Sequence, residues 1–232
     1  CDRPTTVCLC TALPSQPIPT TTHIIILHHP HESRHKLATV PVLSKCLRNS
    51  ETIVGRRLRP GLSPHLDSLH ASSLRHPNES PRAIYLFPPC TPASPAVPIG
   101  QLESSGLITP NLTGLLLIVF DGTWRHAKEM VSASMEFLSK FAIRVCLECD
   151  DGVEGGSIFN SDLILRKEPF GGCRSTLEAV ARALCLLEPN GAEIEGRLIE
   201  VLKAMVRFQA CNLKPGRPRP KMMKKGKWEQ KP

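Results

Sequence analysis

The chain has 232 residues, of which 41% are hydrophobic and 22% are charged, with a formal net charge of +8. This composition is typical of a globular protein with a sizeable core, and it argues against wholesale disorder. The longest uninterrupted apolar run, residues 115–120, is far shorter than the roughly 20 residues of a membrane-spanning helix, and the sequence contains neither a collagen repeat nor a heptad repeat.

The positive charge is concentrated near the C-terminal end. Residues 214–232 contain eight of the 29 basic residues and one of the 21 acidic residues, so the rest of the chain is almost neutral. A segment this rich in Lys and Pro cannot build a core, and we predict a basic disordered tail over residues 213–232. A solubilising or localising role fits such a tail, but we favour electrostatic binding to a polyanion such as RNA.

Three of the ten cysteines, Cys1, Cys8 and Cys10, lie in a Cys-rich segment that we place at residues 1–22. A chain of this size needs no disulfide bonds, so we interpret the cysteines as reduced thiols of an intracellular protein, in the cytoplasm or nucleus. The three thiolates can bind one Zn²⁺, or they can be loose or redox-active thiols. Because the chain begins with Cys rather than Met, we expect a fragment or a processed form, with a fourth zinc ligand upstream.

Short apolar runs alternate with polar segments in the first half of the chain. We predict strands at residues 23–27, 52–57 and 83–87, which are rich in β-branched or aromatic residues. A helix is predicted at residues 36–47. Residues 60–82 and 90–113 are rich in Pro, Ser and Gly and are predicted to be irregular surface.

The second half contains the strongest predicted strand, residues 115–120, which is apolar throughout like a central strand of a parallel sheet. The remaining expected elements are helices at 125–138, 177–187 and 193–209, strands at 141–147 and 163–166, and an acidic Gly-rich turn at 150–156. This alternation predicts one α/β domain over residues 23–212, with a mostly parallel sheet and helices on both faces.

Polar turns at strand ends are the candidates for chemistry, because ligands of open α/β sheets bind beyond the carboxyl ends of the strands. Asp121, Gly122, Thr123 and Trp124 follow the predicted central strand. Gly122 permits a tight turn, and Thr123 can cap the next helix. Asp121 is then either a functional carboxylate or a helix cap, and Trp124 either lines a pocket or anchors the core.

A second turn, residues 171–178, brings glycines and the hydroxyls of Ser175 and Thr176 to the start of a predicted helix. Free N–H groups at such a helix start bind anionic groups. Glu178 can accept a hydrogen bond from an amine or a ribose, or simply complement the helix dipole. The patterns that mark dinucleotide binding, nucleoside triphosphate binding and serine hydrolases are absent from the sequence.

A series of short motifs in chain order resembles one known family. After Cys-x6-Cys-Leu-Cys at the start come Leu27-His-His-Pro-His-Glu32, Gly55-Arg-Arg57, Leu86-Phe-Pro88, Phe120-Asp-Gly-Thr-Trp124, Leu165-Arg-Lys-Glu-Pro169 and Ser175-Thr-Leu-Glu-Ala179. Together they resemble the DTW-domain family, the tRNA-uridine aminocarboxypropyltransferases, over residues 1–209. The sequence departs from the family pattern in the missing upstream part of the Cys cluster and in an extra loop at residues 150–160.

The resemblance implies transfer of the 3-amino-3-carboxypropyl group of S-adenosylmethionine (SAM) to N3 of a tRNA uridine, with release of 5′-methylthioadenosine. It also implies kinship with SPOUT-type methyltransferases, and hence a SPOUT-like fold with a C-terminal trefoil knot. Knots are very rare among proteins in general. No contact with a membrane is expected, and the sequence leaves the oligomeric state open.

Site roles follow from the same resemblance. Asp121 is the expected general base for the N3 proton, with His28 and Glu32 bordering the same cleft. The expected SAM contacts are Gly122, Thr123, Trp124, Ser175, Thr176 and Glu178. Near predicted strand ends, Arg56, Arg57, Arg166 and Lys167 are either contacts with tRNA phosphates or solvated surface charges.

Two other functions are compatible with the sequence. A SPOUT-type RNA methyltransferase would use SAM at the same place but release S-adenosylhomocysteine. A non-catalytic zinc-containing RNA-binding module would use the Cys-rich segment and the basic tail, and its function would survive the change Asp121→Ala.

Overall fold

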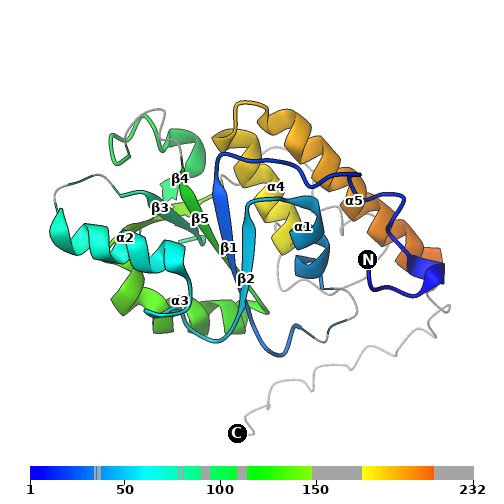
Figure 1. Ribbon diagram of the computed structural model, residues 1–232, viewed down its shortest axis with the longest axis horizontal. Coiled ribbons are helices and arrows are strands. Elements are labelled where there is room, and N and C mark those ends of the chain that lie inside the picture. The colour runs from blue at the N-terminus through cyan, green and yellow to red at the C-terminus, as the bar shows by residue number, and fades with distance from the viewer. Residues whose placement is uncertain are drawn as a thin grey trace, which may run out of the picture.

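The computed structural model describes residues 1–33, 35, 38–77, 79, 81–89, 95–108, 114–147 and 174–211. Within them, six strands form one parallel sheet in the order β2-β1-β5-β3-β6-β4 (Figure 1). The strands are β1 (His23–His28), β2 (Ser50–Val54), β3 (Ala83–Leu86), β4 (Val97–Pro98), β5 (Leu116–Asp121) and β6 (Ala142–Cys146). β5 lies between β1 and β3, which confirms that the longest apolar run is a central strand.

Helices cover both faces of this sheet, as predicted. They are α1 (Val40–Cys46), α2 (Pro64–Arg75), α3 (Trp124–Leu138), α4 (Thr176–Leu187) and α5 (Gly191–Cys211). Two short 3-10 turns, η1 (Thr5–Val7) and η2 (Ile99–Gln101), complete the described elements. In Figure 1, α1, α4 and α5 lie to the right of the sheet, and α2 and α3 lie to the left.

Alternation along the strands divides the core into two clusters. In β1, Ile24 and Ile26 pack with residues of α1, α4 and α5, whereas Ile25 and Leu27 pack with residues of α2 and α3. Successive side chains of a strand point to opposite faces, so an unbroken apolar run supplies both clusters at once. The α/β fold is therefore a direct consequence of strands that are apolar on both faces.

One predicted irregular region is a helix instead. Residues 64–75 form α2, with Pro64 in the first turn after the extended Ser63. Pro is well suited to the start of a helix, because its missing N–H has no intrahelical partner there. Leu66 is fully buried and Leu69 packs beside it, while the exposed residues include Ser68, Leu74 and Arg75. The prediction for residues 60–82 was wrong because this apolar stripe is so narrow.

The prediction for residues 90–113 was also partly wrong, because residues 97–101 form β4 and η2. The expected strand at 163–166, the acidic turn at 150–156 and the tail at 213–232 lie outside the described residues, and the trefoil knot stays a prediction. None of the helices in the described part of the chain is long and apolar enough to cross a lipid bilayer.

Candidate active site at the carboxyl edge of the sheet

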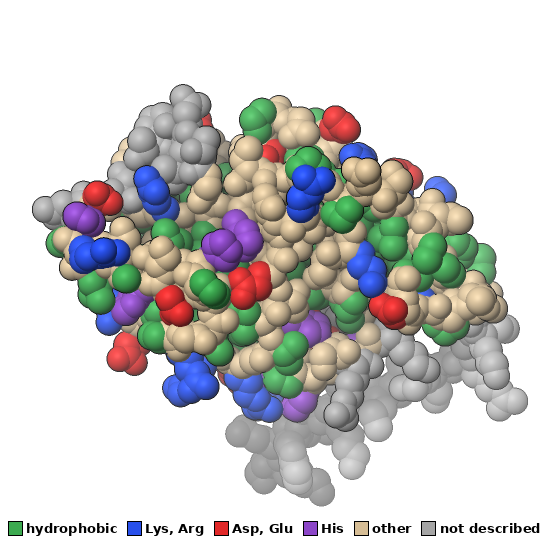
Figure 2. Space-filling model, in the orientation of Figure 1, with side chains coloured by type: hydrophobic (Ala, Val, Ile, Leu, Met, Phe, Trp, Pro, Cys, Tyr) green, Lys and Arg blue, Asp and Glu red, His purple; other side chains and the backbone are tan. Residues whose placement is uncertain are grey.

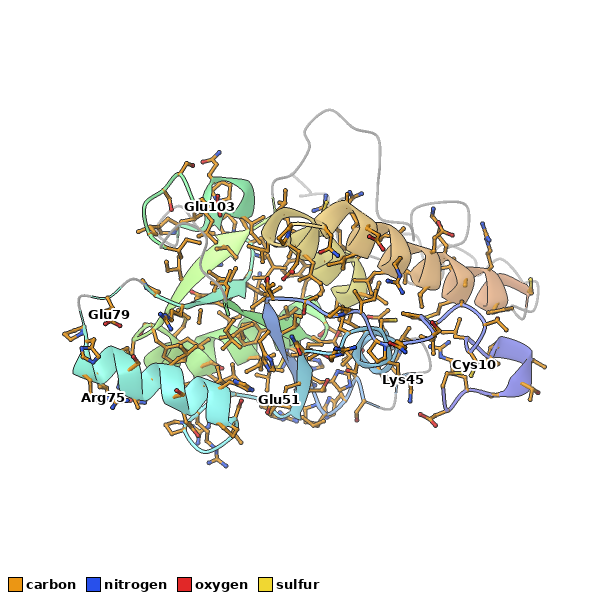
Figure 3. All side chains as sticks on the ribbon, turned by 45° about the horizontal axis from the view of Figure 1, so that its top comes forward. Cys10, Lys45, Glu51, Arg75, Glu79 and Glu103 are labelled. Atoms are coloured by element: carbon orange, nitrogen blue, oxygen red, sulfur yellow. The ribbon has the colours of Figure 1, made fainter. Side chains whose placement is uncertain are left out.

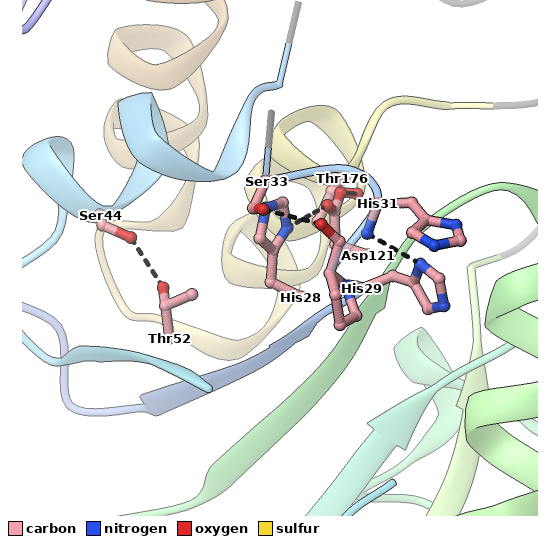
Figure 4. A network of polar contacts seen from close by, with 9 residues as sticks. His28, His29, His31, Ser33, Ser44, Thr52, Asp121 and Thr176 are labelled. Carbon is pink, nitrogen blue, oxygen red and sulfur yellow. Dashed lines mark hydrogen bonds and ion pairs between the residues drawn. The ribbon is translucent and has the colours of Figure 1, made fainter. Parts of the chain in front are cut away.

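Three elements bring polar side chains together at the carboxyl edge of the sheet. β1 and β5 run in parallel with His28 in register with Asp121, so both strands end at the same level. Thr176, the first residue of α4, reaches the same point from the opposite side of the Asp121 carboxylate (Figure 4). The turn after residues 115–120 and the turn before residue 177 therefore meet, as the sequence predicts.

Both oxygens of the Asp121 carboxylate have a partner. Oδ2 lies 2.6 Å from His28 Nδ1, and Oδ1 accepts a hydrogen bond from the Thr176 hydroxyl. Asp121 is 8% exposed and His28 is 3% exposed. An ionised carboxylate only accepts hydrogen bonds, so with an ionised Asp121 the hydrogen lies on His28 Nδ1. The carboxylate is thereby fixed in one orientation at the edge of the sheet.

The second ring nitrogen of His28 has no such partner. Nε2 is buried and makes no hydrogen bond. In a neutral ring that donates through Nδ1, Nε2 carries a free lone pair and is an acceptor. The site therefore presents two proton acceptors, the Asp121 carboxylate and the imidazole that it orients.

The two helices at this edge are capped by hydroxyls of the motif residues. Thr123 Oγ1 accepts a hydrogen bond from the His126 N–H at 3.3 Å, and Ser175 Oγ accepts one from the Glu178 N–H at 3.2 Å. Because Thr123 caps α3, Asp121 is not its helix cap. Trp124 lies edge-on to Phe87, with ring centroids 5.8 Å apart, and packs against the core cluster of α2 and α3.

Gly122 is favoured by close packing rather than by an unusual backbone angle. A Cβ at this position would lie 3.0 Å from His126 Cβ, 3.3 Å from Met130 Cε and 3.4 Å from His29 Cβ. The turn after β5 thus lies directly against α3 and the loop after β1. A larger residue at this position would push these segments apart.

A histidine cluster that the sequence analysis missed lies beside this turn. The ligand-type nitrogens of His29, His31 and His126 all lie within 4.8 Å of one another. The rings of His29 and His126 stack at 3.8 Å, and His31 lies to the right of the Asp121 network in Figure 4. Burial, reinforced by the positive charges of His126 and Arg56, lowers the pKa of His29. The run of histidines at 28–31 was visible in the sequence, but the approach of His126 depends on the fold.

The expected RNA contacts are placed only in part. Arg56 and Arg57 are exposed directly after β2, and the preceding Gly55 N–H donates to the His28 carbonyl, so they lie at the same edge as Asp121. Arg166 and Lys167 lie outside the described residues. On the face shown in Figure 2, Lys and Arg side chains are scattered among acidic ones rather than gathered in one patch.

Two further buried acids lie next to elements that meet at this edge of the sheet. Glu178, in the first turn of α4, is 4% exposed, and Glu32, in the loop after β1, is 8% exposed. Glu178 therefore lies where α4 begins, and Glu32 lies shortly after β1 ends. A surface pocket of about 90 Å³ lies elsewhere, between the end of α2 and Phe141.

The three N-terminal cysteines converge beside η1. Cys1 Sγ and Cys8 Sγ lie 3.6 Å apart, and the sulfurs of Cys1, Cys8 and Cys10 all lie within 4.8 Å of one another. A hydrogen bond with Cys8, helped by nearby positive charge, lowers the pKa of Cys10, whose position near Lys45 is visible in Figure 3. Thiolates so close together fit Zn²⁺, and they supply three of the four ligands of a structural site.

Comparison with known proteins identifies one family. The family model of the DTW domain matches residues 1–210. The chain is 54% identical to tRNA-uridine aminocarboxypropyltransferase A of Arabidopsis thaliana, over 100% of this chain and 88% of the relative. It is 31% identical to tRNA-uridine aminocarboxypropyltransferase 2 of Macaca fascicularis, over 90% of this chain and 62% of the relative, and 30% identical to the protein of that name in Drosophila melanogaster, over 91% and 74%. No solved structure matches the chain.

Proposed function

The chain belongs to the DTW-domain family, and on that premise we propose that it is an enzyme that modifies tRNA by transferring an aminocarboxypropyl group to a uridine. The observation that carries the proposal is the Asp121 carboxylate, which is held between His28 and Thr176. These bonds unite the histidine motif after β1, the Asp-Gly-Thr-Trp motif after β5 and the Ser-Thr motif of α4 in one site.

The chemistry requires a base and a fixed donor. Uridine N3 is a poor nucleophile while it is protonated, and Asp121 takes that proton as a general base. N3 then forms a bond with the γ-carbon of the aminocarboxypropyl chain of SAM. The bond between that carbon and sulfur breaks, and its electron pair stays on sulfur in neutral 5′-methylthioadenosine. No acid is needed for the leaving group, so the remaining task of the protein is orientation.

The donor binds at the start of α4 and along the turn before α3. Ser175 and Thr176 lie where backbone N–H groups can bind its carboxylate. Glu178 offers a carboxylate to its ammonium group. Gly122, Thr123 and Trp124 shape the wall on the side of β5. Because the Thr176 hydroxyl is bonded to Asp121, this residue couples donor binding to the orientation of the base.

The tRNA approaches over the edge formed by Arg56 and Arg57. Both side chains are exposed beside the exit of β1, where they contact phosphates and position the uridine without reading sequence. Arg166, Lys167 and the basic tail extend this contact. Separately from this contact, the Cys1, Cys8 and Cys10 thiolates hold a structural Zn²⁺.

The test is an incubation of purified tRNA with the protein and SAM, followed by mass spectrometry of the nucleosides and of the small-molecule product. We expect a uridine that has gained an aminocarboxypropyl group and an equal amount of 5′-methylthioadenosine. A methyl gain with S-adenosylhomocysteine would replace the proposal by a methyltransferase. Binding of tRNA without any modification would replace it by a binding module. Asp67→Asn, a change in α2 away from the site, is the matched control for variants of Asp121.

A further inference from the structure

A third group of metal-ligand side chains lies at the amino edge of the sheet. His23 is the first residue of β1, Glu51 lies in β2, and His65 lies in the first turn of α2. Their ligand-type atoms all lie within 4.8 Å of one another. His23 is five residues before His28 in a strand, so this group is about 17 Å from the candidate active site.

The fold aims these side chains at one point. His23 shares its face of β1 with Ile25, and Glu51 shares its face of β2 with Ile53, and this is the face that α2 covers. The rings of His23 and His65 have centroids 4.0 Å apart. Glu51 lies beside the start of α2 in Figure 3, and Figure 2 shows histidine and acidic side chains next to each other near the middle of the molecular surface in view.

The carboxylate of Glu51 is held in place by Ser63, whose position would ordinarily make it the cap of α2. Ser63 is the N-cap residue of α2, but its hydroxyl makes no cap bond to that helix. It donates instead to Glu51 Oε2 at 2.7 Å, and Ser63 is buried. Outer hydrogen bonds of this kind orient the carboxylates that bind metal ions. In the part of the chain that the structure describes, Glu51 forms no ion pair with Lys or Arg.

His23 supplies an independent observation. Its Nε2 is buried and has no hydrogen-bond partner among the residues that the structure describes. Leaving a buried polar nitrogen without a partner costs about 1–3 kcal/mol. Burial also lowers the pKa of His23 and so favours the neutral ring, which is the form that binds metal ions.

We propose that His23, Glu51 and His65 bind one divalent transition-metal ion such as Zn²⁺, with a fourth position left for water. Two imidazoles and one carboxylate suit zinc and its neighbours rather than Mg²⁺ or Ca²⁺, which prefer oxygen ligands alone. The ion joins β1, β2 and α2, and its role is to fasten α2 to the sheet. The site is separate from the aminocarboxypropyl transfer and does not rest on it.

The test is a titration of the metal-stripped full chain with Co²⁺, followed by absorption spectroscopy. Sulfur ligands give thiolate-to-cobalt charge-transfer bands, so binding to the Cys cluster is read separately from binding to nitrogen and oxygen. We expect the wild type to bind one Co²⁺ ion without sulfur ligands. His65→Ala and Glu51→Gln should bind this ion at least about 100-fold more weakly, and Ser63→Ala should bind it about 10–100-fold more weakly. His76→Ala, which removes an exposed histidine just after α2, is the matched control and should bind like the wild type.

The alternatives overturn the proposal. If His65→Ala binds the sulfur-free ion as tightly as the wild type, or if the wild type binds no such ion, the site does not exist. If His126→Ala abolishes that binding while His65→Ala keeps it, the ion belongs to the cluster of His29, His31 and His126. A thermal shift gives a second readout, because added Zn²⁺ should raise the melting temperature of the wild type and of His76→Ala by more than that of His65→Ala, in which the Cys cluster can still bind the ion.

Discussion

At the scale of single residues, the candidate site depends on how the Asp121 carboxylate is held. A buried carboxylate is stable only when hydrogen bonds replace its lost water. His28 and Thr176 supply one bond to each oxygen, and they come from elements that are far apart in the sequence. The same two bonds that keep the acid folded in place also fix the direction from which a proton can reach it.

Changing Asp121 to Asn should slow aminocarboxypropyl transfer by about 10²–10⁴-fold, because the amide cannot act as a general base. The fold should survive, since the burial of β5 does not depend on the charge of this side chain. Single-turnover formation of 5′-methylthioadenosine measures the rate, and circular dichroism checks the fold. An unchanged rate would remove Asp121 from the role of base.

His28→Asn is the matched control for this role, because the Asn amide can replace His28 Nδ1–H as a donor to Asp121. If His28 only orients the carboxylate, the rate should fall by less than about tenfold. A loss as large as that of Asp121→Asn would instead identify His28 Nε2, which is buried and has no partner, as the proton acceptor.

The lowered pKa of His29 makes a prediction about stability and pH. Burial is the main cause, the positive charges of His126, Arg56 and His31 add to it, and Glu32 opposes it. The unfolded chain binds this proton more readily than the folded protein, so protonation favours unfolding. The contribution of His29 to stability is therefore complete above the unfolded pKa of about 6.5 and is lost as the pH falls below it.

We expect the free energy of unfolding in urea to fall between pH 7.5 and pH 5.5 and to fall less steeply in His29→Asn. The exposed His76 provides the control, because His76→Asn should keep the slope of the wild type. Equal slopes for His29→Asn and the wild type would show that His29 does not carry this dependence.

The sequence was most informative about side chains that follow strong elements. Asp121 and Thr176 were expected at one edge because each stands next to a strongly apolar strand or helix. The approach of His126 to His29, and the convergence of His23 with Glu51 and His65, depend on strand register and helix docking. The local sequence pattern determines neither strand register nor helix docking, so these groups were visible only in the structure.

At the scale of elements, predictability follows the width of the apolar stripe. β5 and β1 were found because they are apolar on both faces. α2 was missed because one buried Leu and its neighbours provide all of its contact with the core. β4 has only two residues, and among the described strands it pairs with β6 alone, so its identity as a strand comes from its neighbour rather than from its own sequence.

The turn between α4 and α5 contains a glycine that packing requires. A Cβ on Gly191 would lie 2.2 Å from the Cys185 carbonyl oxygen and 2.6 Å from that of Leu184, which belong to the last turns of α4. These neighbours are backbone atoms and cannot rotate away. The two helices can therefore follow each other so closely only when residue 191 has no side chain.

Gly191→Ala should lower the free energy of unfolding by about 1–3 kcal/mol or more, because the two helices must separate. Gly196→Ala in the same helix is the control, since nothing lies within 4 Å of the added Cβ, and it should raise stability by up to about 1 kcal/mol. Urea denaturation measures both. If both variants lose the same stability, the close contact at Gly191 is not the cause.

At the scale of the whole molecule, the N-terminal segment shares the core of the sheet domain. Leu9 and Ile18 belong to the core cluster that α4 and α5 complete, and Ile18 forms a bridge with Leu47. The Glu188 carboxylate accepts hydrogen bonds from the N–H groups of Thr21 and Thr22 and from the Thr21 hydroxyl. One acid at the end of α4 thus fastens the segment that leads into β1.

Glu188→Ala should cost roughly 2–3 kcal/mol, because buried N–H groups lose an ionised acceptor. Limited proteolysis should then cleave residues 1–22 faster than in the wild type. Glu200→Ala, which removes an exposed partner of Lys203, should change either measurement little. Equal protection of residues 1–22 in both variants would contradict the fastening role of Glu188.

The parallel character of the sheet was predictable from the alternation of strands and helices, but the strand order was not. Sequence neighbours do not determine that β5 enters between β1 and β3. That order depends on which crossovers bury the most apolar surface, a property of the complete chain. The position of Asp121 beside His28 follows from this order.

Strand order also determines when each strand can pair during synthesis on the ribosome. One side of β1 is paired as soon as β2 emerges, but the other side must wait for β5, and Asp121 follows His28 by 93 residues. At about 5–20 residues per second, the apolar edge of β1 remains open for roughly 5–20 seconds of synthesis. An open edge of this kind can pair with other chains, so the nascent chain is most exposed to aggregation during this interval. The contact between the His28 imidazole and the Asp121 carboxylate forms only when β5 has been made, so a chain interrupted before β5 has no site at all.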